Sequence, residues 1–167
     1  MSTAIYFASK HGTTEAVARE IAAKLGDDVA VIDLNKTVNP DIRPYENVII
    51  GGSIHFGQIQ QVVVDFCERN LKLLLGKQLG LFICCLLKEK EHEEFENAFT
   101  EMLRNHAKAK GFMGGELIYS RLSLKEKIIT KLVSRTSKEV SAIDHAAIEA
   151  FIKSFTGLTV YQMEHQE

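Results

Sequence analysis

The sequence has no tryptophan, only two prolines and only three cysteines, and it has no apolar run long enough to cross a membrane. The longest candidate run, Leu79–Leu87, has about half the length of a spanning helix. Because two of the cysteines, Cys84 and Cys85, are adjacent, the chain has no disulfide framework of the kind found in small secreted proteins. Its first residues also lack the basic stretch followed by a long apolar stretch that is typical of a signal peptide. These absences predict a reducing, cytoplasmic compartment.

The charge of the chain is small overall and unevenly distributed. The formal net charge is −2 at pH 7, and we expect no nucleic-acid partner. Residues 119–139 carry a net charge of +4, so the rest of the chain carries −6. The length of 167 residues and the apolar fraction of 46% fit a single domain, 1–167, with one core.

Apolar runs of strand length alternate with helical patterns. Strands are expected at Ala4–Ala8, Val29–Leu34, Val48–Ile50 and Leu79–Leu87, with a weaker fifth at Glu116–Tyr119. Helices are expected at Thr13–Leu25, Gln60–Leu75, Glu91–Ala109 and Ile143–Phe155. Continuously apolar strands favour a sheet that is buried on both faces, and the alternation favours parallel strands with right-handed crossovers. The pattern therefore predicts an α/β fold with a doubly wound five-stranded parallel sheet and helices on both faces.

One segment, residues 119–139, does not fit the alternation. Within it, Leu122–Arg135 places Leu124, Ile128 and Leu132 on one ridge, flanked by basic residues. This spacing predicts an amphipathic basic helix inserted after the last strand. The helix either covers an edge of the sheet, with its lysines in water, or binds an anionic membrane or an apolar substrate.

The stretch Ser9-Lys10-His11-Gly12-Thr13-Thr14 separates the first strand from the first helix. In open parallel sheets, ligands bind at the carboxyl ends of the strands, and a helix N-terminus there attracts anions. Gly12 allows a close backbone approach, and three hydroxyl groups add donors, so the stretch predicts a site for one phosphate group. The alternative is that Thr13 or Thr14 only caps the helix. Neither a nucleoside-triphosphatase loop nor a dinucleotide fingerprint is present.

A second candidate segment follows the third strand. Val48–Gln58 contains a Gly- and Ser-rich loop that carries His55 and Phe56. Two such loops at neighbouring strand ends predict one ligand with a phosphate at one end and a flat ring at the other. The alternatives are that Phe56 belongs to the core and that His55 is an ordinary loop residue.

These loops resemble those of the flavodoxin family. Ser9–Thr14 is similar to its phosphate loop, Ile50–Gly57 to its ring-binding loop, and Phe82–Lys88 lies where its third loop begins. The resemblance implies an FMN cofactor and no metal. It implies that FMN binds through Ser9, Lys10, His11, Gly12, Thr13, Thr14, Ser53, Ile54, His55, Phe56, Gly57, Cys85, Leu86, Leu87 and Lys88.

Within this family the chain resembles the flavodoxin-type, menaquinone-dependent protoporphyrinogen oxidases. The likeness lies in Gly52–Gly57, in the helix after it, in the basic insert and in the Asp144–Ile148 pattern at the last helix. The chain differs in having no tryptophan and in having Tyr119 as the one aromatic residue of its insert. His11 also stands where the phosphate loop usually has threonine, and the third loop lacks the flavin-stacking tyrosine of many flavodoxins.

The resemblance implies an FMN-dependent oxidoreductase that acts on a small-molecule substrate or a quinone. His55 is the candidate catalytic residue, because imidazole titrates near neutral pH. The insert, through residues 122–135, would then make a peripheral contact with the inner face of the cell membrane. The alternative is a one-electron carrier that docks to redox partner proteins, for which the acidic stretch Glu89–Glu101 offers a surface. A third interpretation is a flavodoxin fold with another phosphate ligand or with none. For Cys84 and Cys85, core packing is favoured over a redox role.

Overall fold

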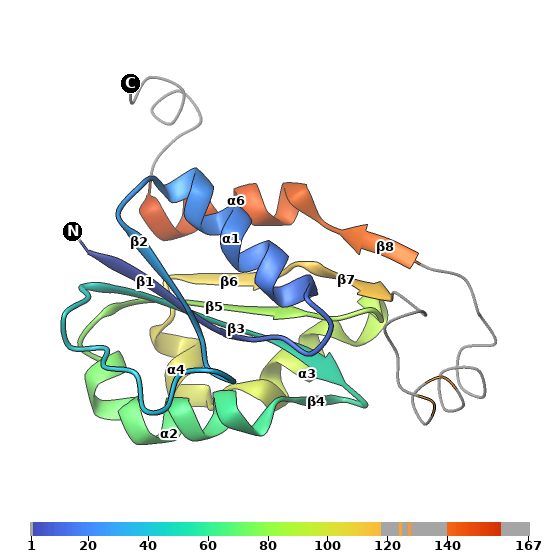
Figure 1. Cartoon of the computed structure of the whole chain (residues 1–167), viewed down its shortest axis with the longest axis horizontal. Coiled ribbons are helices and arrows are strands. Elements are labelled where there is room, and N and C mark those ends of the chain that lie inside the picture. Colours follow the sequence, from blue (N-terminus) through green and yellow to red (C-terminus); the bar gives the residue numbers. More distant parts are fainter. Residues whose placement is uncertain (1, 118–123, 125–126, 128–139, 158–167) are drawn as a thin grey trace.

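Five parallel strands form the central sheet, in the order β2-β1-β3-β5-β6 (Figure 1). The structure is a computed structural model that describes residues 2–117, 124, 127 and 140–157. The strands are β1 (Thr3–Ala8), β2 (Val29–Asp33), β3 (Asn47–His55), β5 (Gln78–Cys84) and β6 (Ala109–Phe112). A short strand, β4 (Gln58–Ile59), pairs antiparallel with the end of β3. This order places β1, β3 and β5 side by side at the centre of the sheet.

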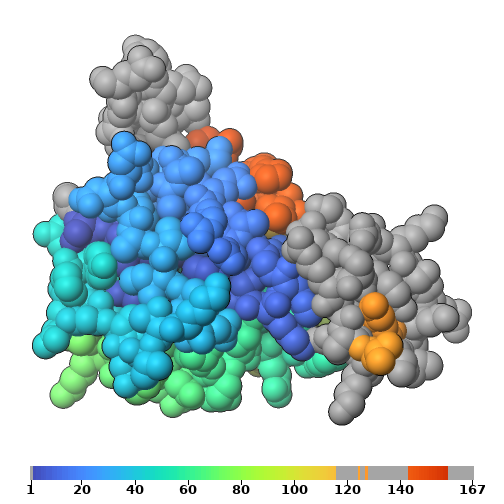
Figure 2. All heavy atoms as spheres, in the orientation of Figure 1, coloured from blue at the N-terminus to red at the C-terminus, as the bar shows by residue number. Residues whose placement is uncertain are grey.

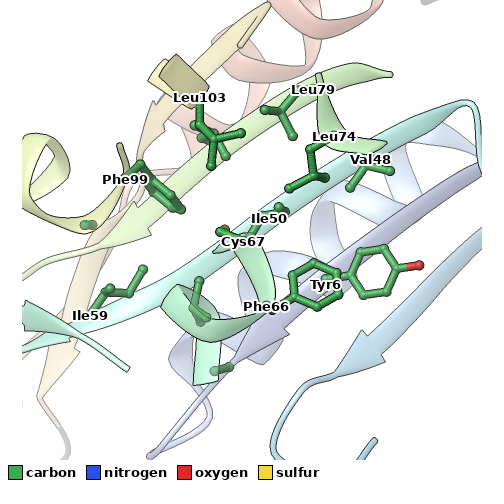
Figure 3. Packing of buried hydrophobic residues seen from close by; sticks show 14 of the residues in the cluster. Tyr6, Val48, Ile50, Ile59, Phe66, Cys67, Leu74, Leu79, Phe99 and Leu103 are labelled. Carbon is green, nitrogen blue, oxygen red and sulfur yellow. The ribbon is translucent and has the colours of Figure 1, made fainter. Parts of the chain in front are cut away.

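Helices cover both faces of the sheet. α1 (Thr13–Leu25) and α6 (His145–Thr156) lie on one face, and α2 (Gln61–Leu74), α3 (Glu91–Ala98) and α4 (Glu101–His106) lie on the other (Figure 1). A 3-10 turn, η1 (Lys88–Lys90), precedes α3. Each face has its own apolar cluster, and in the one under α2 Tyr6 packs against Phe66 with ring centroids 4.7 Å apart (Figure 3). The predicted fold class is confirmed.

The fifth strand of the sheet is not the one that the sequence predicted. It is β6, which lies at the end of the expected helix Glu91–Ala109 and just beyond it. β6 is four residues long at an edge of the sheet, and it alternates buried Ala109 with exposed Lys110, so it has no continuous apolar run. The expected strand Glu116–Tyr119 overlaps β7 (Gly114–Leu117), which pairs antiparallel with β8 (Val140–Ile143) in a separate ribbon.

Two predicted helices differ from the observed ones by more than one residue at an end. The expected helix Glu91–Ala109 is divided into α3 and α4, because Phe99 is extended and Thr100 begins a new helix by accepting the Leu103 N–H at 3.5 Å. The last helix begins after Asp144, whose carboxylate accepts the Ala147 N–H at 2.9 Å. Ile143, expected to be helical, belongs to β8.

The third strand is longer than predicted. Gly51, Gly52 and Ser53, expected in a loop, continue β3 to His55. A Cβ on Gly51 would lie 2.0 Å from the ring of Phe82, so this glycine makes room for an aromatic side chain of the core. The predicted basic helix Leu122–Arg135 lies outside the described residues, apart from Leu124 and Lys127, which are helical.

Candidate functional site

Three segments meet where β1, β3 and β5 end. The register pairs Ala8 with Gly52 and Ser53 with Cys84, so the residues that follow these strands lie side by side at one edge of the sheet. The three segments are Ser9–Thr14, the hairpin Ser53–Gln58 and Cys85–Lys88. All the residues that the sequence suggested for a cofactor therefore lie at the same edge of the sheet.

The first segment leads directly into α1. Gly12 precedes the helix with φ of 97°, in the left-handed region that favours glycine, and its N–H donates to Ser9 Oγ at 3.0 Å. Gly12 is the N-cap residue of α1, and Thr13 and Thr14 are already helical, so the alternative in which one of these threonines is the cap is wrong. Glycine has no side chain that could accept the first N–H groups of this 13-residue helix, which is the arrangement that suits an anion at a helix N-terminus.

A phosphate group fits this segment. Thr14 is fully buried, and its Oγ1 makes no hydrogen bond within the residues that the structure describes. Its hydroxyl lies near enough to Cys84 to oppose slightly the rise in the pKa of that thiol. Buried hydroxyls normally have a partner, so a donor of this kind in the first turn of a helix that begins at a glycine cap suits an anionic ligand.

The second segment is a β-hairpin. His55 pairs with Gln58, and the two residues between them both have positive φ, 51° at Phe56 and 79° at Gly57. Positive φ at both central positions is typical of a type I′ turn, in which phenylalanine is unusual. The Phe56 side chain is 70% exposed, so the alternative that assigned it to the core is wrong.

His55 is tied to its neighbours by a short chain of polar contacts. Its Nε2 lies 3.1 Å from Ser53 Oγ, which accepts a hydrogen bond from the Gln60 amide. The Oε1 atom of the Gln60 side chain in turn accepts the Ser53 N–H at 3.0 Å. A hydroxyl can donate or accept, so Ser53 can keep its contact with His55 whether or not the imidazole is protonated.

The first two segments touch through their histidines. The rings of His11 and His55 are 5.5 Å apart between centroids, at an interplanar angle of 74°. The edge-to-face contact places two titratable side chains between the helix N-terminus and the hairpin.

The third segment turns its first side chain inward and the next ones outward. Cys85 is buried, whereas Leu86 and Leu87 are about half exposed and Lys88 is exposed. Burial raises the pKa of the Cys67, Cys84 and Cys85 thiols to about 12, and the hydrogen bond from Cys85 to Glu94 acts in the same direction. All three are therefore neutral thiols at physiological pH, which favours the core-packing interpretation.

Sequence reasoning did not single out Gln60 or Glu94. Gln60 was expected as the first residue of a helix, but it precedes α2 and its side chain binds Ser53. Glu94 lies in a run of glutamates that indicates a solvated helix, yet its side chain is buried against Cys85. Its spacing of four residues from Ala98, which is also buried, places both on one face of α3, and this spacing is the signal that a helical wheel could have offered.

A cleft of about 560 Å³ lies elsewhere, between α1, β2 and the segment that leads to β3. Figure 2 shows this face, with α1 in blue and the following segment in lighter blue and cyan. Four of its charged groups form two ion pairs, Arg19 with Glu15 at 2.9 Å and Lys36 with Asp33 at 3.1 Å. None of the residues suggested for the cofactor lines this cleft, so it is separate from the candidate cofactor site at the strand ends.

Comparison with known proteins gives consistent results. A family model described as "Flavodoxin domain" matches residues 4–144. The chain is 22% identical to a protoporphyrinogen IX dehydrogenase [quinone] of Escherichia coli, over 95% of this chain and 97% of that protein. It is 31% identical to flavodoxin 1 of E. coli, over 60% of this chain and 56% of that protein. The structure of oxidised flavodoxin 1 from Bacillus cereus matches with a TM-score of 0.55 at 17% identity, covering 95% of this chain and 99% of the other. That structural likeness shows a common fold.

Among the described residues, no helix has both the length and the apolar character needed to cross a membrane.

Proposed function

This chain belongs to the flavodoxin domain family, and on that premise we propose that it is an FMN-dependent oxidoreductase of the quinone-linked, protoporphyrinogen oxidase type. Membership of this redox-related flavoprotein family supports FMN as the cofactor. The observation that carries the proposal is the meeting of three segments at the carboxyl ends of the central strands, one of them a helix N-terminus whose cap residue is glycine.

The first segment would bind the FMN phosphate. The backbone N–H groups at the start of α1 and the hydroxyls of Ser9 and Thr14 are the donors, and Lys10 adds positive charge at the exposed rim. Gly12 lets the backbone turn toward the anion, since its φ of 97° is one that other residues rarely adopt. Thr13 lies in the first turn of the helix and contributes its N–H.

The hairpin and the third segment would bind the flavin ring from its two sides. The turn at Phe56 and Gly57 brings backbone groups to the hairpin tip, and Ser53, Ile54 and His55 lead to it. On the other side, the backbone of Cys85 and the side chains of Leu86 and Leu87 form an apolar wall that ends at Lys88.

FMN, when bound, would supply the redox chemistry that connects the reduced substrate with the quinone. His55 is the residue that takes up or returns the accompanying proton. The Ser53 hydroxyl and the Gln60 amide hold its imidazole at the hairpin, and they suit both protonation states. In each two-electron step, the substrate loses a hydride equivalent and a proton, and the quinone gains both to become the quinol.

The protoporphyrinogen-like substrate class rests on three observations. The relatives matched over nearly the whole chain are protoporphyrinogen IX dehydrogenases [quinone]. The rim of the site presents exposed Phe56, Leu86 and Leu87, which suit a large apolar substrate. The basic segment 119–139 then offers a contact with an anionic membrane surface, where quinones reside.

The direct test is protoporphyrin fluorescence, which appears as protoporphyrinogen is oxidised with a soluble quinone under anaerobic conditions. The proposal predicts oxidation that depends on protein, FMN and quinone together. A variant without residues 122–135 should keep its FMN and lose this activity with quinone in vesicles. Full activity without the segment would remove its proposed role, and no activity in the intact protein would reject the substrate class.

The second candidate function is that of a one-electron carrier, and one acidic surface of the molecule favours it. Exposed glutamates on and around α3 form an acidic face beside the third segment: Glu89, Glu93, Glu96 and Glu101. Such a face steers basic partners. A carrier should pass electrons from a flavodoxin reductase to cytochrome c at a rate that falls steeply with salt. It should show no quinone-dependent oxidation of protoporphyrinogen.

A further inference from the structure

The peptide bond between Cys85 and Leu86 is packed closely against strand β7. The Cys85 N–H donates to the Gly114 carbonyl oxygen at 2.8 Å. A Cβ built on Gly115 would lie 2.9 Å from both the Cys85 carbonyl carbon and the Leu86 nitrogen. Any larger residue at position 115 would therefore push β7 away from this peptide or displace the peptide itself.

The same residue is held from α3. The Cys85 thiol donates to Oε2 of Glu94, whose side chain belongs to the first turns of α3 and is only 6% exposed. Burying a carboxylate is costly unless it is hydrogen-bonded, and within the described part of the chain this thiol is its hydrogen-bond partner. The neighbouring Glu93 and Glu96 are exposed, so a glutamate on this helix does not need to be buried.

These contacts determine which side chains of the third segment face outward. Cys85 is 7% exposed because its sulfur is directed to Glu94, whereas Leu86 is 48% exposed and Leu87 is 45% exposed. If the thiol were released, the segment could rotate and the two leucines could turn toward the core. We call this set of residues the Cys85 clamp: Cys85, Glu94, Gly114 and Gly115.

We infer that Glu94 and Gly115 are positioning residues of the flavin-ring site, which act through the Cys85 clamp by holding the Cys85–Leu86 peptide in place. The inference rests on the proposed binding of FMN. Neither residue would touch the cofactor. The clamp holds the third segment, which is proposed to bind the flavin ring, and not the first segment, which is proposed to bind the phosphate. Its loss therefore weakens the binding of riboflavin and of FMN by the same factor.

The experiment measures the dissociation constants of FMN and riboflavin by fluorescence quenching, together with the melting temperature of the cofactor-free protein. Glu94→Leu and Gly115→Ala should each weaken both ligands about tenfold, the worth of one ordinary hydrogen bond. Glu94→Gln, which keeps an acceptor for the thiol, should stay within about threefold of the wild type. Glu93→Leu and Gly76→Ala are matched controls, the first at an exposed helix position and the second at a glycine where a Cβ would make only an ordinary contact, 3.5 Å from the Leu73 carbonyl oxygen. Both should change neither constant.

The outcomes separate the inference from the proposed function. If the wild type binds neither flavin, both are rejected. If the wild type binds while Glu94→Leu and Gly115→Ala bind equally well, or lose only melting temperature, the clamp has a purely structural role and the inference is wrong. If those variants do not fold, the pair Glu94→Gln and Glu94→Met decides, since the two side chains have similar lengths and only glutamine keeps an acceptor for the thiol. Glutamine should keep the affinity and methionine should lose it, and equal affinity would overturn the inference.

Discussion

The imidazoles of His11 and His55 meet edge to face, with their centroids 5.5 Å apart, and thereby join the phosphate segment to the hairpin. His55 is the proposed proton-transfer residue, so His55→Gln should lower turnover by about a hundredfold or more. The affinity for FMN should change little, because glutamine can still bond to Ser53. Steady-state rates over a range of pH, alongside FMN titrations, check this. A variant that keeps both its rate and its pH profile would show that His55 only links the two segments.

The Thr14 hydroxyl should strengthen the binding of the FMN phosphate and leave the binding of the flavin ring unchanged. Thr14→Val preserves the shape of a fully buried side chain and removes the hydroxyl that lacks a hydrogen-bond partner among the described residues. FMN should bind about ten- to a hundredfold more weakly, since hydrogen bonds to charged groups contribute roughly 1.5–3 kcal/mol. Riboflavin, which has no phosphate, should bind as before. Thr37→Val, at an exposed position, serves as the control, and an equal loss for both flavins would contradict the placement.

The glycine at position 51 should be required for stability. A Cβ there would overlap the ring of Phe82, which is fully buried, so Gly51→Ala should destabilise the fold by about 1–3 kcal/mol. Phe82→Leu alone should also destabilise it by leaving a cavity. The double variant should be more stable than the sum of the two losses predicts, because each change relieves the other. Urea unfolding of the four proteins measures this coupling, and strict additivity would contradict the packing argument.

The buried thiols predict a stability that falls at alkaline pH. Burial raises the pKa of Cys67 to about 12 in the folded protein, while an unfolded thiol loses its proton near pH 8.5. Between these values the unfolded chain binds fewer protons than the native one, so unfolding becomes easier as the pH rises. Each such thiol contributes a slope of about 1.4 kcal/mol per pH unit. Urea unfolding between pH 9 and pH 10.5 should therefore give Cys67→Ala a shallower pH dependence than the wild type, and identical slopes would refute the prediction.

The raised pKa values of the buried thiols also predict slow alkylation of the native protein. At pH 8, a thiol with a pKa of about 12 should react with iodoacetamide roughly a thousandfold more slowly than an ordinary cysteine. All three cysteines should become reactive in urea. Rapid labelling of the native protein at Cys84 or Cys85 would show that the end of β5 opens to solvent.

The sequence predicted best where one local signal acts alone. The helix Thr13–Leu25 has the predicted limits because a glycine and polar residues separate it sharply from an apolar strand. The strands β1, β2 and β5 were found within a few residues because each contains an apolar run, which for the buried β1 and β5 follows from a sheet that is covered on both faces. The short edge strand β6 has no such run, and its pairing with β5 depends on contacts that are distant in sequence.

The parts of the site that were missed depend on tertiary contacts. Gly51 and Gly52 look like loop residues, but they lie inside β3 because Phe82 and Ile59 occupy the space beside them. Glu94 looks like one of several solvated glutamates, and only the fold brings the Cys85 thiol to it. The local composition of a segment can thus predict that it lies at the strand ends, while the residues that hold the segment in place appear only in the structure.

The central claim is that the strand ends bind FMN, with the phosphate at the start of α1. The most direct measurement is a parallel titration of FMN and riboflavin against the purified protein and its Gly12→Asp variant, followed by flavin fluorescence. We predict quenching of FMN that saturates at one equivalent, tighter binding of FMN than of riboflavin, and loss of that preference in the variant. Saturation with no preference for FMN, or no quenching of either flavin by the wild type, would contradict the account.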